Sequence, residues 1–282
     1  MTTRGRHAIK TPPHHTDWAA MLAVWTAADG MDVFESAWNW DHFYPLAAPF
    51  DGPNLEGWTT LAALAQATSR IRVGAMVNGM HHRHPAVTAN MAATLDHIAG
   101  GRFDLGMGAG WNTMESDAYG LDLGTITERC DRFDEGMDVI ASLLAERETS
   151  YAGEYYQLTD AWCEPKPLQA HIPIVIGARG PKRTLRTTAR HADQWDMTFP
   201  ADVAEWASLD AALRGHCDDV GRDQADITRS IHLPFDSAGD PAPEVDRAAT
   251  FFGAGVDVVV WSWRGPLDPA KLEVLATAIE AA

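Results

Sequence analysis

The sequence lacks any long apolar run, and it is poor in cysteine. No stretch reaches the ~20 consecutive apolar residues that a membrane helix needs, and Met1–Lys10 is polar, without the apolar core of a signal peptide. The three cysteines, Cys130, Cys163 and Cys217, lie far apart and form neither a CxxC pair nor a disulfide framework. These absences predict a soluble cytoplasmic protein.

Positive charge is also scarce. Lys and Arg number 22 against 39 Asp and Glu, which gives a formal net charge of −17. Nucleic acid is therefore not an expected partner, because neutralising phosphates requires a basic face. An anionic small molecule would need a local basic patch or free backbone N–H groups.

The motifs of the common hydrolases are missing as well. The sequence has no GxSxG, no HExxH and no P-loop, and no Ser-His-Asp or Cys-His set stands out. Hydrolysis therefore has no positive support.

What the sequence does contain is an alternation of short apolar runs with amphipathic helical stretches. At 282 residues it suits one barrel of roughly 250 residues, and we expect a single domain over 1–282 because no linker interrupts the alternation. The predicted strands are His7–Lys10, Val33–Trp38, Ile71–Val77, Arg102–Met107, Pro173–Gly177, Trp195–Thr198, Ile227–Leu233 and Val256–Trp261.

Helix signals lie between these strands. Pro85 fits the first turn of a helix that Gly100 stops, and Thr125 with Glu128 forms a capping-box pattern. We predict further helices over Asp17–Asp29, Glu56–Ser69, Pro181–Ala192 and Pro269–Ala281, one along Val203–Cys217, and a short hairpin at Tyr151–Leu158.

Eight strands and about eight helices predict a (β/α)₈ TIM barrel of the α/β class. A doubly wound open sheet is the alternative, since periodicity does not show closure. In a barrel the active site lies at the C-terminal ends of the strands, so the residues that follow each strand are the candidates.

Asp41 and His42 follow the second predicted strand. Histidine can donate or accept a proton near neutral pH, and Asp41 could orient it or hold a polar edge of a cofactor. The alternative is a surface Asp–His pair in a loop.

The third predicted strand is followed by Asn78 and then by His81, His82, Arg83 and His84. No acidic or cysteine residue completes a known metal spacing there. A solvated loop or a contact with an anion is favoured over a metal site, and we expect no metal.

Closely spaced glycines follow the fourth and fifth predicted strands. In GMGAGWN, Gly106–Asn112, they predict either a tight turn or a ligand cradle, and the spacing is not that of a GxGxxG motif. In GARGPKRTLR, Gly177–Arg186, free N–H groups at a helix start combine with Arg179 to favour an anion site over an exposed basic face. Arg264, after the eighth strand, could also meet an anion.

Several separated blocks, taken together, resemble the luciferase-like monooxygenase superfamily, and most closely its F420-dependent oxidoreductase branch. The resemblance covers about Asp17–Asp196 and is carried by WDHFYP, DGPNLEGWTTLAALAQATSRIRVG, RHPAVTANMAATLDHIAGGRFDLGMGAGWN with ESDAYG, and PIVIGARGPKRTLRTTARHADQWD.

The resemblance implies a TIM barrel, usually a homodimer, with a flavin or the deazaflavin coenzyme F420 in the barrel mouth. His42 would act as the proton donor, beside Asp41. A non-prolyl cis peptide would lie in the third strand. The implied cofactor contacts are Ala75, Met76, Val77 and Asn78 around that peptide, Gly108, Ala109, Gly110, Trp111 and Asn112 in the fourth-strand loop, and Gly177, Ala178, Arg179 and Gly180 at the phosphate.

One position departs from the family pattern. Some F420-dependent dehydrogenases of the superfamily carry a catalytic Glu where this sequence has Trp111, and Glu115 lies one helical turn further on. A sugar-phosphate dehydrogenase is therefore disfavoured, and we do not assume that Glu115 replaces the missing acid.

The resulting hypothesis is hydride transfer between F420 and a small organic substrate. An FMN-dependent monooxygenase on the same barrel is the first alternative, and a non-catalytic flavin-binding protein is the second. Trp40, Phe43, Tyr44 and Trp111 are expected to form an aromatic mouth, whereas Trp38 fits ordinary core.

Overall fold

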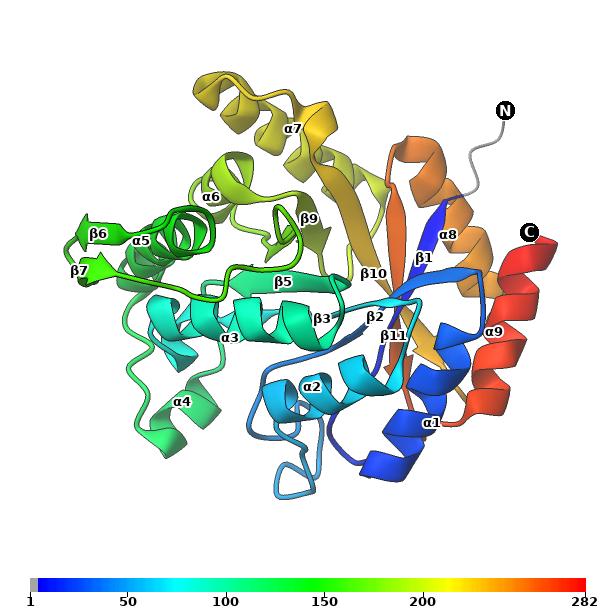
Figure 1. The fold of residues 1–282 in the computed structure, drawn as a ribbon. Helices are drawn as coiled ribbons and strands as arrows, with labels where there is room; N and C mark the ends of the chain where they lie inside the picture. Colours follow the sequence, from blue (N-terminus) through cyan, green and yellow to red (C-terminus); the bar gives the residue numbers. More distant parts are fainter. Residues whose placement is uncertain (1–4) are drawn as a thin grey trace.

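A closed barrel of parallel strands forms the centre of the protein in a computed structural model that describes residues 5–282 (Figure 1). The sheet order is β3-β2-β1-β11-β10-β9-β8-β5, and β3 also pairs with β5, which closes the sheet on itself. The TIM barrel is confirmed and the open-sheet alternative is wrong. The barrel strands are β1 (Arg6–Lys10), β2 (Phe34–Asn39), β3 (Arg72–Ala75), β5 (Phe103–Gly108), β8 (Ile174–Gly177), β9 (Gln194–Met197), β10 (Thr228–Asp236) and β11 (Val258–Arg264).

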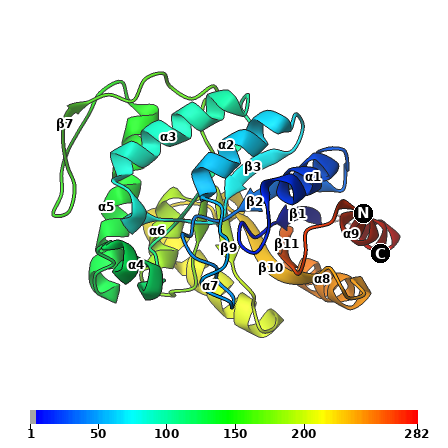
Figure 2. The ribbon, with the colours of Figure 1, turned by 90° about the horizontal axis from the view of Figure 1, so that it is seen from below.

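The helices surround the strands, as the view along the barrel shows (Figure 2). The Thr125–Glu128 capping box opens α5, and Pro85 opens α3, as predicted. The short α4 and the helix α8 have no counterpart among the predicted ranges. The helices are α1 (Trp18–Asp29), α2 (Gly57–Ala67), α3 (Pro85–Ile98), α4 (Thr113–Tyr119), α5 (Ile126–Ala145), α6 (Thr184–His191), α7 (Val203–Val220), α8 (Ala242–Ala254) and α9 (Pro269–Ala281), with short 3₁₀ turns at Met80–His82 and Gln224–Asp226.

Two differences between the predicted and observed bounds bear on the site. The strand predicted over Ile71–Val77 ends at Ala75, and β4 (Asn78–Gly79) resumes the pairing with β5. The Met76–Val77 peptide between them is cis, at the position that the family resemblance implies. The helix predicted from Pro181 begins at Thr184, because residues 181–183 form a turn.

The predicted hairpin is present outside the barrel, as β6 (Thr149–Ala152) and β7 (Gln157–Ala161), which pair antiparallel beside α5 (Figure 1). In the part of the chain from residue 5 onward, no helix has the length and hydropathy to span a membrane.

Strand side chains alternate between the helices and the barrel interior. Outward residues such as Ile9 and Val73 join the large core under the helices. The interior holds a small separate cluster, which confirms Trp38 as core: Ala8, Trp38, Met76, Val175, Val258 and Val260. The next inward residues toward the C-terminal ends, among them Lys10 and Ser262, open into a cavity.

Candidate active site

A cavity of ≈ 870 Å³ opens at the C-terminal ends of the barrel strands. Its volume lies in the range of about 300–1,000 Å³ that is usual for small-molecule sites. Apolar walls such as Met76, Val77 and Trp263 alternate with a few polar side chains. The polar side chains that line it include Lys10, His14, His42, His81, His82, Asp196 and Arg264.

His42 is held in this cavity by a buried carboxylate. Its Nδ1 lies 2.5 Å from Oε1 of Glu115 in α4, and the backbone N–H of Phe43 donates to Oε2 of Glu115 at 2.8 Å. Burial opposes ionisation of Glu115, but the hydrogen bond and charge of His42 outweigh it and lower the pKa of the carboxyl. Glu115 is therefore an ionised acceptor that fixes the ring of His42 and leaves Nε2 for a bound molecule.

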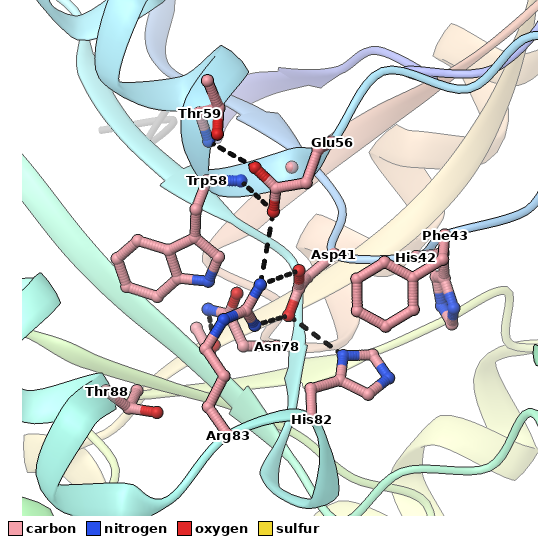
Figure 3. Close-up of polar contacts among 12 residues, drawn as sticks. Asp41, His42, Phe43, Glu56, Trp58, Thr59, Asn78, His82, Arg83 and Thr88 are labelled. Carbon is pink, nitrogen blue, oxygen red and sulfur yellow. Dashed lines mark hydrogen bonds and ion pairs between the residues drawn. The ribbon is translucent and has the colours of Figure 1, made fainter. Parts of the chain in front are cut away.

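Asp41 does not line the cavity, and it organises a second polar group (Figure 3). Its carboxylate accepts hydrogen bonds from both terminal nitrogens of Arg83, at 2.5 and 3.0 Å, and from Nδ1 of His82 at 3.1 Å. Arg83 also reaches Glu56, the residue that caps α2. Burial raises the pKa of Asp41, but the bonds from His82 and Arg83 outweigh this and lower it overall.

The loop that carries His81 and His82 is packed inward. The side chain of His82 is 1% exposed, so the prediction of a solvated loop is wrong for this residue. His81 contacts Oγ of Ser116 at 3.1 Å, and burial together with the neighbouring His82 lowers the pKa of His81 to about 4. His81 is therefore neutral at physiological pH.

The glycines at the ends of β5 and β8 make room for Ala75 and for Val77, which lies between β3 and β4. A Cβ on Gly106 would lie 2.0 Å from the carbonyl oxygen of Ala75, and one on Gly108 would lie 2.7 Å from Cγ2 of Val77. A Cβ on Gly177 would lie 3.1 Å from Cγ1 of Val77. These contacts give Gly106, Gly108 and Gly177 a packing role within the barrel, whatever they contribute to ligand binding.

The predicted anion site is partly occupied by the protein's own groups. Arg179 bonds to Glu205 and to the carbonyl of Thr198, and Arg183 bonds to Asp131. The N–H of Ala178 donates to the carbonyl of Asp196, and that of Gly180 to Oγ1 of Thr184. Phosphate binding at Gly177–Gly180 stays a prediction. The positive charge of Arg179 in this segment is already paired with Glu205.

The predicted site residues divide into two sets. Those that line the cavity are His42, Met76, Val77, Gly110, Trp111 and Gly177. Those outside its lining are Asp41, Ala75, Asn78, Gly108, Ala109, Asn112, Ala178, Arg179 and Gly180. Asn78 is buried and donates to the carbonyl of Gly106, so it supports the strand interruption.

The expected aromatic mouth is also divided. Trp40 and Trp111 line the cavity, and Trp111 is 62% exposed. Phe43 stacks on Tyr119 of α4 at 4.9 Å, and Tyr44 meets the same ring edge-on. Phe43 and Tyr44 therefore anchor α4, which in turn carries Glu115.

Three functional candidates were missed from the sequence. Glu115 was noted without a role, and Lys10 and Asp196 were not singled out. A signal was present for Lys10, because it stands two residues after Ala8 in a short apolar strand and so shares its inward face.

Nearly the whole chain is similar to a known protein family. The family model described as luciferase-like monooxygenase matches residues 4–277. The chain belongs to this family. Members of the luciferase-like family are oxidoreductases and monooxygenases, and the resemblance drawn from the sequence blocks is confirmed.

Among curated relatives, uncharacterised proteins of Mycobacterium tuberculosis and Mycobacterium bovis are 37% identical over 149 residues, 53% of this chain and 51% of theirs. The chain thus spans about half the length of these relatives. The F420-dependent glucose-6-phosphate dehydrogenase of Kineococcus radiotolerans is 31% identical over 259 residues, 91% of this chain and 74% of that protein. A pyrimidine monooxygenase RutA from an Enterobacter species is 29% identical over 261 residues, 90% of this chain and 65% of that protein.

Solved structures share the whole fold at low identity. An F420-dependent secondary alcohol dehydrogenase, in complex with an F420-acetone adduct, superposes with a TM-score of 0.88 at 16% identity, covering 99% of both chains. The F420-dependent tetrahydromethanopterin reductase of Methanopyrus kandleri gives 0.83 at 19% identity, again over 99% of both chains. These likenesses show the fold alone.

Proposed function

We propose that the protein is an F420-dependent oxidoreductase that transfers a hydride between the deazaflavin and a small organic substrate. The observation that carries the proposal is the His42–Glu115 pair, at 2.5 Å, in a cavity large enough for a cofactor ring and a small substrate. The choice of F420 rests on the Kineococcus relative, which is similar over 91% of this chain.

The residues present fit a flavin-type ring. Such a ring is a flat, largely apolar body with a polar edge, and the cavity offers apolar walls beside Lys10, His42 and His81. Trp40 and His81, which line it, each carry a ring nitrogen without a hydrogen-bond partner within residues 5–282. A bound F420 would donate the hydride in its reduced form or accept it in its oxidised form.

The chain's own contribution is proton transfer and orientation. Glu115 accepts from Nδ1 of His42, so Nε2 is the nitrogen that exchanges a proton with the substrate. When a carbonyl is reduced, the imidazolium donates this proton to the oxygen. When an alcohol is oxidised, neutral His42 accepts it, and the Glu115 carboxylate stabilises the cation that forms.

Titration of the purified protein with F420 and with FMN, each followed by its fluorescence, tests the cofactor. We expect F420 to bind more tightly than FMN. Binding of FMN with no binding of F420 would contradict the proposal and favour an FMN-dependent monooxygenase, the second candidate, which the RutA relatives support.

Turnover separates either enzyme from a non-catalytic flavin-binding protein. A panel of small alcohols and ketones, assayed with oxidised or reduced F420, gives the substrate class. The homodimer that the resemblance implies stays a prediction, and sedimentation of the purified chain tests it.

A further inference from the structure

Lys10 places a cationic side chain deep in the cavity. It is the last residue of β1, and strand alternation turns it to the same inward face as Ala8 of the interior cluster. It pairs in register with Ser262 of β11 and Trp38 of β2. Lys10 is only 7% exposed, yet it lines the cavity, so what remains accessible of it faces this space.

The ammonium of Lys10 lies over an aromatic ring, but among residues 5–282 it has no hydrogen-bonding or ionic partner. Nζ lies 5.2 Å from the centroid of the Trp40 ring, and within residues 5–282 it makes no hydrogen bond and no ion pair within 4.0 Å. Burial lowers the pKa of Lys10 to about 8, and the charge of Asp196 offsets part of this effect. A substantial fraction of Lys10 therefore stays charged near neutral pH.

Asp196, the carboxylate whose charge acts on Lys10, is already bonded by other groups. Oγ of Ser230 donates to its Oδ1 at 2.7 Å, and Nε2 of His232 lies 3.0 Å from its Oδ2. His232 is fully buried, and this burial lowers its pKa, so the ring is neutral. The cluster on β1, β9 and β10 thus holds one carboxylate with two donors and one ammonium with no acceptor.

A buried charge without a hydrogen-bond partner is costly, and proteins rarely keep one unless a ligand completes it. We infer that Lys10 donates a charge-assisted hydrogen bond to a carbonyl or carboxylate oxygen of the molecule that occupies the cavity. The inference rests on the proposed function, because it requires that this cavity is the ligand site. The oxygen belongs either to the ring of the cofactor or to the substrate.

The test compares Lys10→Met with Lys271→Met, which removes an exposed lysine of α9 that does not line the cavity. Dissociation constants are measured for F420, for FMN and, on cofactor-free protein, for acetate as a minimal oxyanion. We expect Lys10→Met to raise the dissociation constant of at least one of these probes by tenfold or more, which corresponds to about 1.4 kcal/mol. Lys271→Met should change none of the three constants.

Each pattern of results has a meaning. Weaker F420 or FMN binding assigns the oxygen to the cofactor, whereas unchanged cofactor binding with weaker acetate binding assigns it to the substrate. Equal binding of all three probes to Lys10→Met and the wild type would overturn the inference. Failure of the wild type to bind either cofactor contradicts the proposed function, and the acetate comparison still decides the role of Lys10.

Thermal unfolding shows whether a change in binding is caused by loss of the folded structure. Replacing a buried unpaired charge by an apolar chain of similar length should leave the melting temperature of Lys10→Met equal or higher. If this variant does not fold, Lys10→Gln keeps a polar donor without the charge, and the same binding comparison is made with it.

Discussion

Two sides of the cavity solve the problem of buried charge differently. On the histidine side, made of Asp41, His42, His82 and Glu115, each imidazole lies against a carboxylate, at 2.5 Å for His42 and 3.1 Å for His82. On the lysine side, made of Lys10, Asp196 and His232, the carboxylate is bonded and the ammonium is not.

The two sides also come from different parts of the barrel. The histidine side is assembled from loops after β2 and β4 and from α4, whereas the lysine side consists of inward residues within β1, β9 and β10. Pairing orients a group that must move a proton in a fixed direction. An ammonium that no protein group accepts from is free to donate its hydrogen bonds to a ligand. The difference therefore separates a catalytic role for His42 from a binding role for Lys10.

The largest expected effect is on turnover. His42→Ala should lower kcat by about 10²–10⁴-fold, the usual contribution of a general acid or base, while the Kd of the cofactor changes little. Steady-state kinetics with the substrate found in the panel, together with cofactor titration, measures both values.

His216→Ala is the matched control, because this histidine is on α7 and contacts the carbonyl of Pro181 outside the cavity. A drop in kcat of less than threefold for His42→Ala would remove the catalytic role of the histidine side. The comparison would also collapse if Lys10→Met lowered kcat as strongly without weakening any probe.

The sequence predicts more of the barrel than of the difference between the histidine side and the lysine side. Strand and helix periodicity locate all eight barrel strands, but closure depends on the β3–β5 pairing, which no local pattern shows. Glu115 has no assigned role because α4 is a seven-residue helix, too short for a periodic signal. Its contact with His42 joins residues 73 positions apart in the chain.

Glycine spacing gives a second case. The glycines of GMGAGWN suggest a close approach to a ligand. In the structure, however, Ala75 of β3 and Val77 between β3 and β4 occupy the space beside Gly106 and Gly108. The sequence marks positions where a side chain does not fit. Only the tertiary structure tells whether a ligand or another strand takes the space.

An effect of intermediate size concerns stability. Asp41→Asn should lower the free energy of unfolding by about 3 kcal/mol, because it removes the charge that Arg83 and His82 share in a buried setting. Urea unfolding measures the loss, and Asp51→Asn, at an exposed loop position, is the control. A loss below 1 kcal/mol would mean that Glu56 alone compensates Arg83, and that the histidine side is less dependent on pairing than its geometry indicates.

The smallest effect is a pH dependence of stability that distinguishes His81, which packs against His82, from Lys10, and the two pKa shifts set an upper limit of about 3 kcal/mol for each. The pKa of His81 is about 4 in the folded protein, mainly through burial, against 6.5 in the unfolded chain. Between pH 4 and 6.5 the unfolded state binds more protons, so stability rises with pH in this window. The pKa of Lys10 is about 8 against 10.5, again through burial, so stability rises with pH a second time between pH 8 and 10.5.

Free energies of unfolding measured from pH 4 to 10 in the wild type, His81→Gln and Lys10→Met resolve the two windows. His81→Gln should make the acidic rise smaller without abolishing it, because burial also lowers the pKa values of His7 and His14 to about 4, and it should leave the alkaline rise intact. Lys10→Met should remove the alkaline rise and leave the acidic one, with Asp196 and His232 as the titratable groups that face Lys10. If Lys10→Met leaves the alkaline rise intact, Lys10 is not held as a buried unpaired cation. The claim that the lysine side holds an unpaired cation would then be wrong, whereas the assignment of the His42–Glu115 pair would not be affected.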